Sequence, residues 1–542
     1  MGTHLLTGGR IYSPASPDAT AMAVTDGTVV WVGADHVGRA LHPDAQIIDL
    51  AGAFVAPAFV DSHVHLTSTG LSLDGLDLAE VTDRESCLRA LAAYCDRAPE
   101  GELIWGLGWD DSAWPIPGPP TTAEIDAIAG GRPVYLARID EHSAAASSSL
   151  RALVDDLETL PGFDPDQPLT AEAHHQVRGR ARALITPAAG ARAARRALDD
   201  ALAHGIVAVH ENGGPDISGL GDFAALATID HPVLIRRYWG QLATDADHAR
   251  ELMSATGADA LGGDLFVDGA IGSHTAFLSS PYTDDPAGRG VNYIPAEAVL
   301  AHLRACTAAG VQAGFHIIGD AATDIVATAL DTVVAEFGSA VVARCAHRVE
   351  HAEMVTRAQA ASLAAAGVTA SMQPLFDALW GGPGDLYEQR LGAERVAGMN
   401  DFAGLAREGV NLSFSSDSPV TSMRPWETIR AAAHHHDPES AVSPRAAFAA
   451  CTRGGWRAGG VNDGVSGTLV PGAPAHYAVW DVDDLVVAAS SPRVQRWSTD
   501  PRSGVPPLPD VSPGAALPRC LRTVSAGAVV YDTGALDAAE TV

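Results

Sequence analysis

Short apolar runs alternate with alanine-rich segments through the middle of the chain, and this alternation constrains the fold more than any other feature. The apolar runs, such as GIVAVHENG and VQAGFHIIG, have the length and composition of buried strands. Repeated strand–helix units build a parallel sheet. Eight strand candidates spread over roughly 400 residues therefore predict an α/β fold, a (β/α)8 TIM barrel. The helical segments expected between the strands include 190–204, 320–336, 355–366 and 398–408.

The two ends of the chain have a different sequence pattern, in which short runs of β-branched and aromatic residues are broken by Gly, Asp and Pro. Neither end supplies enough strands to close a core alone, so we expect them to pair with each other. The predicted organisation is a small β-sandwich domain from 1–56 and 465–542, and a barrel over 57–464. An insertion at about 70–185 carries the proline-rich stretch PIPGPPTT.

Charge and composition narrow the class of partner. The chain has 542 residues, with 35 basic and 66 acidic side chains and a net charge of −31. Such a surface repels phosphate backbones and anionic membranes, so we expect a small-molecule substrate, no nucleic acid and no membrane. The sequence has no secretory signal, no apolar run of 18 residues and six scattered cysteines without CxxC. These features predict a cytoplasmic protein with reduced thiols, and the exposed insertion is compatible with a homodimer.

Imidazoles and carboxylates end several of the predicted strands, which is where chemistry gathers in a barrel. His63 and His65 are two residues apart on a strand, so both side chains point to one face and can chelate one ion. A single histidine at a strand end is more often structural. A ring of them has no structural explanation, because buried imidazoles need partners. The set that predicts a divalent metal site such as zinc is His63, His65, His316, His351 and Asp417.

The motifs around these residues resemble those of the amidohydrolase superfamily: VDSHVH, GFHIIGDAA, RVEHAEM and FSSDSPV, in that order. GLGWDDSAW and LFVDGAIGSHTAFLSSPY are similar to its YtcJ-like branch, which includes N-substituted formamide deformylases. The resemblance implies a zinc-dependent hydrolase that cleaves a C–N bond of a non-peptide amide. It implies that His63 and His65 hold one metal position, that His316 and His351 hold a second or assist the first, and that Asp417 contacts the metal and its water.

One departure from the family pattern concerns the residue that bridges two metals. Many relatives use a carboxylated lysine within a segment similar to VKLFADG, whereas this chain has GDLFVDG, with Asp264 at the lysine position. The chain contains no lysine at all, so a carbamate bridge is impossible. Either Asp264 bridges with its shorter side chain, or the site holds one metal. We predict a single tightly bound zinc with a second site weak or absent, and iron or manganese as alternative ions.

The mechanism expected from these residues is hydrolysis by a metal-activated water. Asp417 would act as general base and then general acid, and His351 or His316 would stabilise the oxyanion. For Trp109 and Asp110, packing and turn roles are equally compatible with the sequence, and a solvated loop position is equally compatible for His274. The triplet His434–His436 predicts a solvated helix end, with metal binding as the weaker alternative. Further candidates for substrate contacts are Trp109, Asp110, His142, Asp268 and His274.

Two other functions stay open at this stage. A deaminase of the same superfamily would use the same metal ligands and release ammonia. A non-catalytic ligand-binding barrel would be expected to have lost at least one metal ligand, and all five are present.

Overall fold

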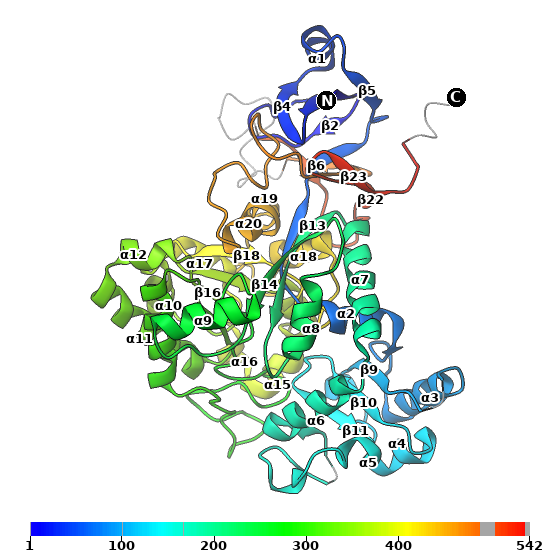
Figure 1. Cartoon of the computed structure of the whole chain (residues 1–542), viewed down its shortest axis with the longest axis vertical. Coiled ribbons are helices and arrows are strands. Elements are labelled where there is room, and N and C mark those ends of the chain that lie inside the picture. The colour runs from blue at the N-terminus through cyan, green and yellow to red at the C-terminus, as the bar shows by residue number, and fades with distance from the viewer. Residues whose placement is uncertain (1, 100, 166, 488–504, 537–542) are drawn as a thin grey trace.

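The computed structural model describes residues 2–99, 101–165, 167–487 and 505–536. Three parts follow one another along its long axis (Figure 1). Sheets from both chain ends lie at the top, the strand–helix region lies in the middle, and the inserted segment lies at the bottom.

The central region is a TIM-barrel-like α/β fold. Its strands are all parallel and form two sheets, ordered β14-β13-β7 and β15-β16-β17-β18. Isolated parallel bridges join the sheets: Tyr238 to Ala260, Leu261 to Ala313, and Val64 to Ser418. The pairing therefore runs in a ring, in which residues 260–266 connect β14 to β15. The strands are β7 (Phe59–Val64), β13 (Ile206–Gly213), β14 (Leu234–Trp239), β15 (Gly314–Ile317), β16 (Arg348–His351), β17 (Thr369–Met372) and β18 (Asn411–Phe414).

Helices between these strands pack against the outside of the ring, except those over residues 374–396, which belong to a separate apolar cluster. The helix α7 (Pro187–Ala203) shows why these residues are helical: Thr186 caps its first turn, Pro187 occupies the first position, and buried alanines and leucines recur at helical spacing. The other helices are α2 (Leu66–Asp74), α8 (Gly219–Leu226), α9 (Ala246–Thr256), α10 (Ala296–Ala309), α11 (Asp320–Phe337), α12 (Ser339–Arg344), α13 (Arg357–Ala365), α14 (Pro374–Trp380), α15 (Leu386–Leu391), α16 (Ala393–Val396), α17 (Phe402–Glu408), α18 (Pro425–Ala433), α19 (Pro444–Ala449) and α20 (Gly455–Ala458).

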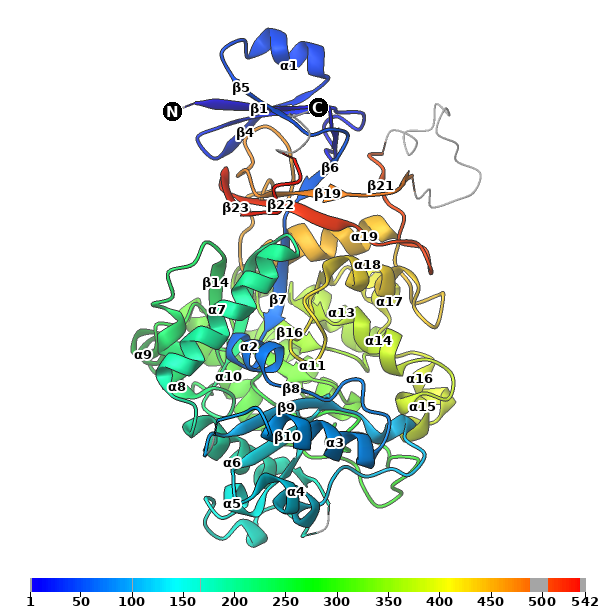
Figure 2. The same cartoon turned by 90° about the vertical axis from the view of Figure 1, so that its right-hand side faces the viewer.

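The two chain ends share a hydrophobic core. One sheet contains β4 (Thr28–Gly33), β3 (Ala21–Thr25), β1 (Thr3–Thr7) and β5 (Gln46–Asp49), and α1 (Asp35–Leu41) packs beside it. The other contains β2 (Arg10–Ile11), β6 (Phe54–Pro57), β19 (Tyr477–Asp481), β22 (Arg519–Ser525) and β23 (Ala528–Asp532). Strands from both chain ends thus pair in one sheet, where β6 from the N-terminal segment lies beside β19 from the C-terminal segment (Figure 2). A short pair, β20 (Leu485–Val486) and β21 (Leu508–Pro509), lies nearby. Within the predicted terminal domain, 488–504 and 537–542 lie outside the described residues.

The insertion folds around a sheet of its own. Five strands run in the order β12-β11-β10-β9-β8, and separate apolar clusters cover the two faces of this sheet. Strand β7 runs from the terminal sheets toward this insertion (Figure 2), so the carboxyl ends of the barrel strands face it. Its elements are β8 (Leu76–Asp77), α3 (Arg84–Cys95), β9 (Ile104–Trp109), α4 (Thr122–Ala129), β10 (Val134–Arg138), β11 (Ser143–Ala146), α5 (Ser148–Arg151), β12 (Leu169–Thr170) and α6 (Ala171–Ala183).

Two expectations about the whole chain can be compared with the structure. All six cysteines are free, and five of them are buried. Among the described residues, none of the helices combines the length and apolar character that a membrane crossing requires.

Candidate metal centre

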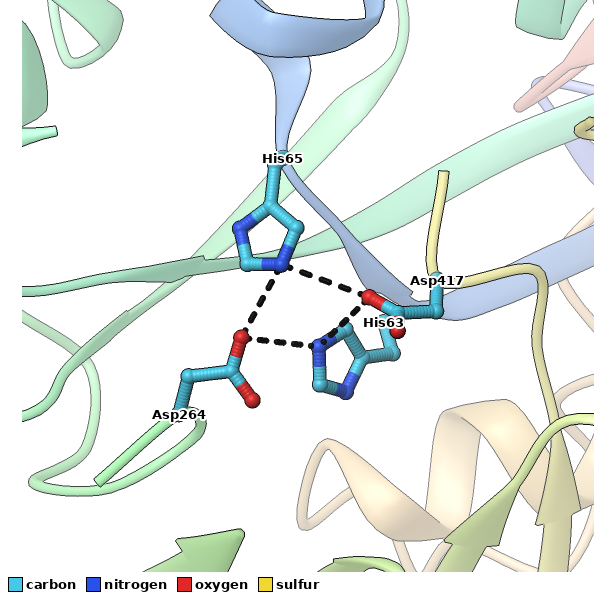
Figure 3. Close-up of side chains that lie close together, drawn as sticks. All are labelled: His63, His65, Asp264 and Asp417. Atoms are coloured by element: carbon cyan, nitrogen blue, oxygen red, sulfur yellow. Dashed lines mark hydrogen bonds and ion pairs between the residues drawn. The ribbon is translucent and has the colours of Figure 1, made fainter. Parts of the chain in front are cut away.

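Four side chains from distant parts of the chain meet at the carboxyl ends of the barrel strands (Figure 3). The Nε2 atom of His65 lies 2.9 Å from Oδ2 of Asp264 and 3.3 Å from Oδ1 of Asp417. The Nε2 atom of His63 lies 3.3 Å and 3.1 Å from the same two oxygens. All four residues are buried, and their ligand atoms surround one point. His63 lies in β7 and His65 directly follows this strand, and both imidazoles reach the same carboxylates.

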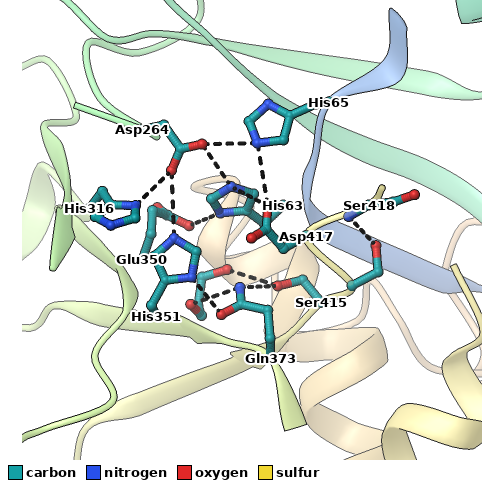
Figure 4. A network of polar contacts seen from close by, with 12 residues as sticks. His63, His65, Asp264, His316, Glu350, His351, Gln373, Ser415, Asp417 and Ser418 are labelled. Atoms are coloured by element: carbon teal, nitrogen blue, oxygen red, sulfur yellow. Dashed lines mark hydrogen bonds and ion pairs between the residues drawn. The ribbon is translucent and has the colours of Figure 1, made fainter. Parts of the chain in front are cut away.

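Asp264 also belongs to a second group of ligands (Figure 4). Its other oxygen, Oδ1, lies 3.4 Å from Nδ1 of His316 and 3.6 Å from Nε2 of His351. The Nε2 atom of His316 lies 3.3 Å from the carbonyl oxygen of Gly269, to which it can donate its proton. The carboxylate at the lysine position of the family pattern thus stands between two groups of ligands, one oxygen toward each, despite its shorter reach.

The second nitrogen of each of two imidazoles is held by a hydrogen-bond acceptor. Nδ1 of His63 donates to Oε2 of Glu350 at 2.8 Å, and Nδ1 of His351 donates to Oε1 of Gln373 at 2.9 Å. In a neutral ring, these partners leave Nε2 of each imidazole without a proton and facing the centre. That is the tautomer of a metal-binding histidine, oriented by a carboxylate or amide behind it.

The residues present fit a divalent cation. Nε2 of His351 and Oδ1 of Asp417 are buried and lack a hydrogen-bond partner among the described residues, and both point at the centre. Two carboxylates among neutral imidazoles leave a buried negative charge, which requires compensation. Burial lowers the pKa of His63, but Asp264 and Asp417 outweigh burial and raise it well above its usual value. A proton can therefore occupy the place that a cation would take.

A layer of buried polar residues supports the ligands from behind. Glu350 also accepts two hydrogen bonds from Arg348, whose Nη1 atom lies 3.0 Å from Nδ1 of His210. Asp61 accepts from the backbone N–H of Ser416 at 3.0 Å, which fixes the loop that carries Asp417. Asp417 itself has a positive φ of 55° and His351 one of 66°, conformations that cost energy in residues other than glycine. The backbone holds both side chains toward the centre at this cost.

A small cavity opens beside both ligand groups. Its volume is about 30 Å³, close to the space of one water molecule, and His316, His351 and Asp417 form part of its wall. Arg138 from the insertion also lines it, but Asp110 at 2.6 Å and Asp140 at 2.8 Å compensate its charge. The remaining wall is largely apolar and includes Ile271, Ile318, Phe376, Trp380, Leu386 and Val420.

The predicted substrate contacts within the insertion occupy different positions. His142 lines the cavity, and its ring lies 5.3 Å from that of His316. Trp109 is buried in the core of the insertion, where its Nε1 donates to the Leu136 carbonyl. Asp110 accepts from Arg138 and from Nε1 of Trp380 at 3.2 Å, so it ties the insertion to a cavity wall without lining the cavity.

Asp268 and His274 belong to neither group of ligands. Asp268 accepts hydrogen bonds from the backbone N–H groups of Phe277, Ile318 and Gly319 at 2.7–3.0 Å, an arrangement that anchors a loop. His274 is one-third exposed and contacts Asp284 at 3.1 Å, outside the cavity. A substrate-binding role for either residue stays a prediction that no observed contact supports.

Sequence reasoning missed several residues near the centre. Gln373 and Arg138 carried no spacing signal, because their roles depend on contacts between distant elements. Glu350 was visible only as the neighbour of His351 within RVEH. The expectation of a solvated His434–His436 is wrong for His435, which is buried, although His434 is exposed.

Comparison with known proteins places this geometry in context. The family described as "Amidohydrolase family" matches residues 46–531. The protein LONG AFTER FAR-RED 3 of Arabidopsis thaliana is 28% identical over 531 residues, which cover 90% of this chain and 89% of that protein. The putative amidohydrolase YtcJ of Bacillus subtilis is 27% identical over 452 residues, 78% of this chain and 82% of that protein.

Two further relatives have informative descriptions. The N-substituted formamide deformylase of Arthrobacter pascens is 23% identical over 514 residues, 88% of this chain and 92% of that protein. A crystal structure of an uncharacterized metal-dependent hydrolase from Pyrococcus furiosus superposes with a TM-score of 0.68 at 26% identity, over 89% of this chain and 99% of that one.

Proposed function

Because the chain belongs to the amidohydrolase family, as a hydrolase that acts on C–N bonds, we propose that it cleaves a non-peptide amide with metal-activated water. Its similarity to YtcJ and to the formamide deformylase identifies the YtcJ-like branch, so an N-substituted formamide is the first candidate substrate. The observation that carries the proposal is the position of Asp417, which belongs both to the ligand cluster and to the cavity wall. A carboxylate there can exchange a proton with a molecule in the cavity.

Zinc is the proposed ion, because imidazole and carboxylate ligands suit it, with iron or manganese as alternatives. It would supply Lewis acidity, which lowers the pKa of water and polarises a substrate carbonyl. His63, His65, Asp264 and Asp417 offer four ligand atoms to one ion. The group of Asp264, His316 and His351 offers three, so we assign the tighter binding to the four-residue group and a weaker second position to the three-residue group.

Asp417 is the proposed general base and general acid. It would accept a proton from water and later deliver it to the leaving nitrogen, so that an amine departs neutral. His351, the second proposed catalytic residue, and His316 line the cavity beside Asp417. Because their ring N–H groups are taken by Gln373 and by the Gly269 carbonyl, either imidazole would stabilise the charge on the carbonyl oxygen by holding a cation beside it.

The cavity wall supports a neutral substrate. Its carbonyl group would lie beside His316, His351 and Asp417, and the similarity to the formamide deformylase favours a formyl group there. The aromatic and aliphatic wall favours an apolar substituent on nitrogen. Arg138 is the cation in this wall, and its two carboxylate partners leave no free charge for an acidic substrate.

The finer architecture is also part of the proposal. We assign 57–464 to a (β/α)8 barrel with an insertion at about 70–185, and 1–56 with 465–542 to a β-sandwich. The cytoplasmic location and the homodimer stay predictions.

The test is a product analysis with zinc-loaded protein. N-benzylformamide and N-butylformamide are compared with the matching acetamides, and formate, amine and ammonia are each measured. We expect formate and amine in equal amounts from the formamides, much slower turnover of the acetamides, and loss of turnover in Asp417→Asn.

Other outcomes would replace the proposal. Ammonia release from amidine-like heterocycles, without formamide cleavage, would establish the deaminase. Retained metal with no turnover on any compound of either class would favour the non-catalytic barrel.

A further inference from the structure

A second cluster of metal-binding side chains lies outside the centre. Asp377 on α14 meets His435 and His436, which occupy the turn after α18. One ligand atom of each lies within 4.8 Å of the others. We propose that these three residues bind a divalent cation of the zinc type, a site distinct from the catalytic centre.

The geometry at His435 is the first argument. Its side chain is fully buried, and its Nε2 lies 3.1 Å from Oδ1 of Asp377, yet Nε2 has no hydrogen-bond partner among the described residues. Nδ1 lies 3.1 Å from the carbonyl oxygen of Asp437, which can accept its proton. The same combination marks His351 in the centre: a nitrogen directed at a carboxylate without hydrogen-bond geometry, and an acceptor behind the ring. It is the arrangement of a ligand atom.

A hydrogen-bonded alternative exists for this turn. The backbone N–H of Asp437 lies 3.0 Å from Nδ1 of His435, and this contact would put the ring proton on Nε2. That proton would then need an acceptor in line with it, and Oδ1 of Asp377 does not meet that condition. The cation therefore accounts for the position of Nε2 better than a hydrogen bond does.

The different contacts of the two carboxylate oxygens of Asp377 are the second argument. Oδ2 accepts the backbone N–H of His436 at 3.0 Å, which fixes the carboxylate. Oδ1 accepts a hydrogen bond from Nδ1 of His436, and Nε2 of His435 lies 3.1 Å from the same oxygen. A cation would replace the proton of that hydrogen bond. Two imidazole nitrogens converging on one carboxylate oxygen form a set of N, N and O ligands, which suits zinc and its neighbours in the transition series.

Space beside the ligand atoms is the third argument. Gly381 follows α14, and a Cβ atom at this position would contact Oδ1 of Asp377 and lie 2.9 Å from Nδ1 of His436. The glycine therefore keeps a side of the cluster free of atoms. The side chain of His436 is 18% exposed, so water can reach the site and complete the coordination of an ion.

The position of the cluster indicates what the ion does. Helix α14 carries Phe376 and Trp380, two walls of the substrate cavity, and the ring of Phe376 stacks on that of His351 at 6.0 Å. An ion held by Asp377 and the turn after α18 would fix this helix against its neighbour. Its role is to hold the cavity wall in place, with no part in the chemistry.

Zinc content per chain tests the site without any substrate, so its result is independent of the proposed function. The protein is stripped with a chelator, reloaded with Zn²⁺, freed of excess metal and analysed by mass spectrometry. The variants are Asp377→Asn and His436→Gln, with His434→Gln as the matched control on an exposed neighbour. We expect the wild type and His434→Gln to hold equal zinc, and both cluster variants to hold one ion fewer.

Two further measurements keep the test decisive. The addition of Zn²⁺ should raise the Tm of the wild type more than that of His436→Gln. If Asp377→Asn fails to fold, His436→Gln decides, because its side chain is partly exposed. Equal zinc in all four proteins would overturn the site. An equal loss in His434→Gln would also overturn it, because the surface triplet would then be binding zinc non-specifically.

Discussion

The proposed catalytic centre and the Asp377 cluster use the same ligand types and differ in how the fold assembles them. In the centre, His63 lies in β7, His65 directly follows it, and Asp417 follows β18; the carboxyl ends of these parallel strands meet by the geometry of the sheet. In the cluster, a helix and a turn 59 residues apart are brought together by packing alone. Only the first arrangement places its ligands where the strand pattern of the sequence predicts them.

The two regions also differ in access. His316, His351 and Asp417 border the substrate cavity, whereas the cluster lies behind the helix that forms its wall. Ligand chemistry alone therefore does not identify a catalytic metal site, because a catalytic site must also contact a cavity. Substitutions in the centre should act on catalysis, whereas substitutions in the cluster should act on the support of the cavity wall.

The largest expected difference follows from exchanging one aspartate for asparagine in each region. Asp417→Asn removes the proton acceptor, and kcat should fall by about a thousandfold. Asp377→Asn should lower kcat far less, because Asp377 does not line the cavity. Steady-state kinetics on the best formamide measures both changes. Equal losses in the two variants would abolish the distinction between the regions.

A second contrast lies within one segment, between Asp264 and Asp268. Imidazoles surround Asp264, whereas Asp268 accepts backbone N–H groups only. Burial raises the pKa of Asp268 to about 7, and its three backbone hydrogen bonds only partly oppose that rise. Its ionisable neighbours are His351, Glu353, Tyr282 and Tyr293.

This contrast predicts a dependence of stability on pH. An acid whose pKa is raised on folding stabilises the protein at low pH, and that contribution disappears as the pH rises toward 7. Between pH 5 and pH 8 the loss from Asp268 is roughly 2–3 kcal/mol, about two pKa units. Chemical denaturation at both values should show a smaller loss for Asp268→Asn than for the wild type. Identical losses would mean that the carboxyl is ionised throughout.

The sequence predicts those parts of the fold and of the site that depend on local patterns, and it does not predict those that depend on contacts between distant residues. Strand–helix alternation indicated the α/β fold, and the strand ends indicated the residues that the structure brings together around Asp264. The sheet of the insertion was not predicted, because β8 and β12 have two residues each and carry no periodicity. His435 was not predicted as a buried residue, because its burial depends on the distant Asp377.

Loss of the hydrogen bond that orients a ligand should weaken metal binding at the centre and leave metal binding at the Asp377 cluster unchanged. Glu350→Gln deletes the charge that orients His63, and zinc affinity at the centre should fall 10–100-fold. The matched control is Glu336→Gln, an exposed carboxylate paired with Arg304. Competition with a chromophoric chelator measures both affinities. A loss of the same size in the control would exclude a specific effect on His63.

The smallest expected effect concerns the wall between the two regions. Trp380→Phe keeps an aromatic ring in the cavity but removes the Nε1 hydrogen bond to Asp110, which joins α14 to the insertion. Because Arg138 still compensates Asp110, the cost should be about 1 kcal/mol, seen as a roughly fivefold rise in KM with kcat little changed. Zinc content should not change, since neither metal group includes Trp380. A fall in kcat with KM constant would instead mean that the wall positions the reacting groups. Helix α14 would then contribute to catalysis as well as to the support of the cavity.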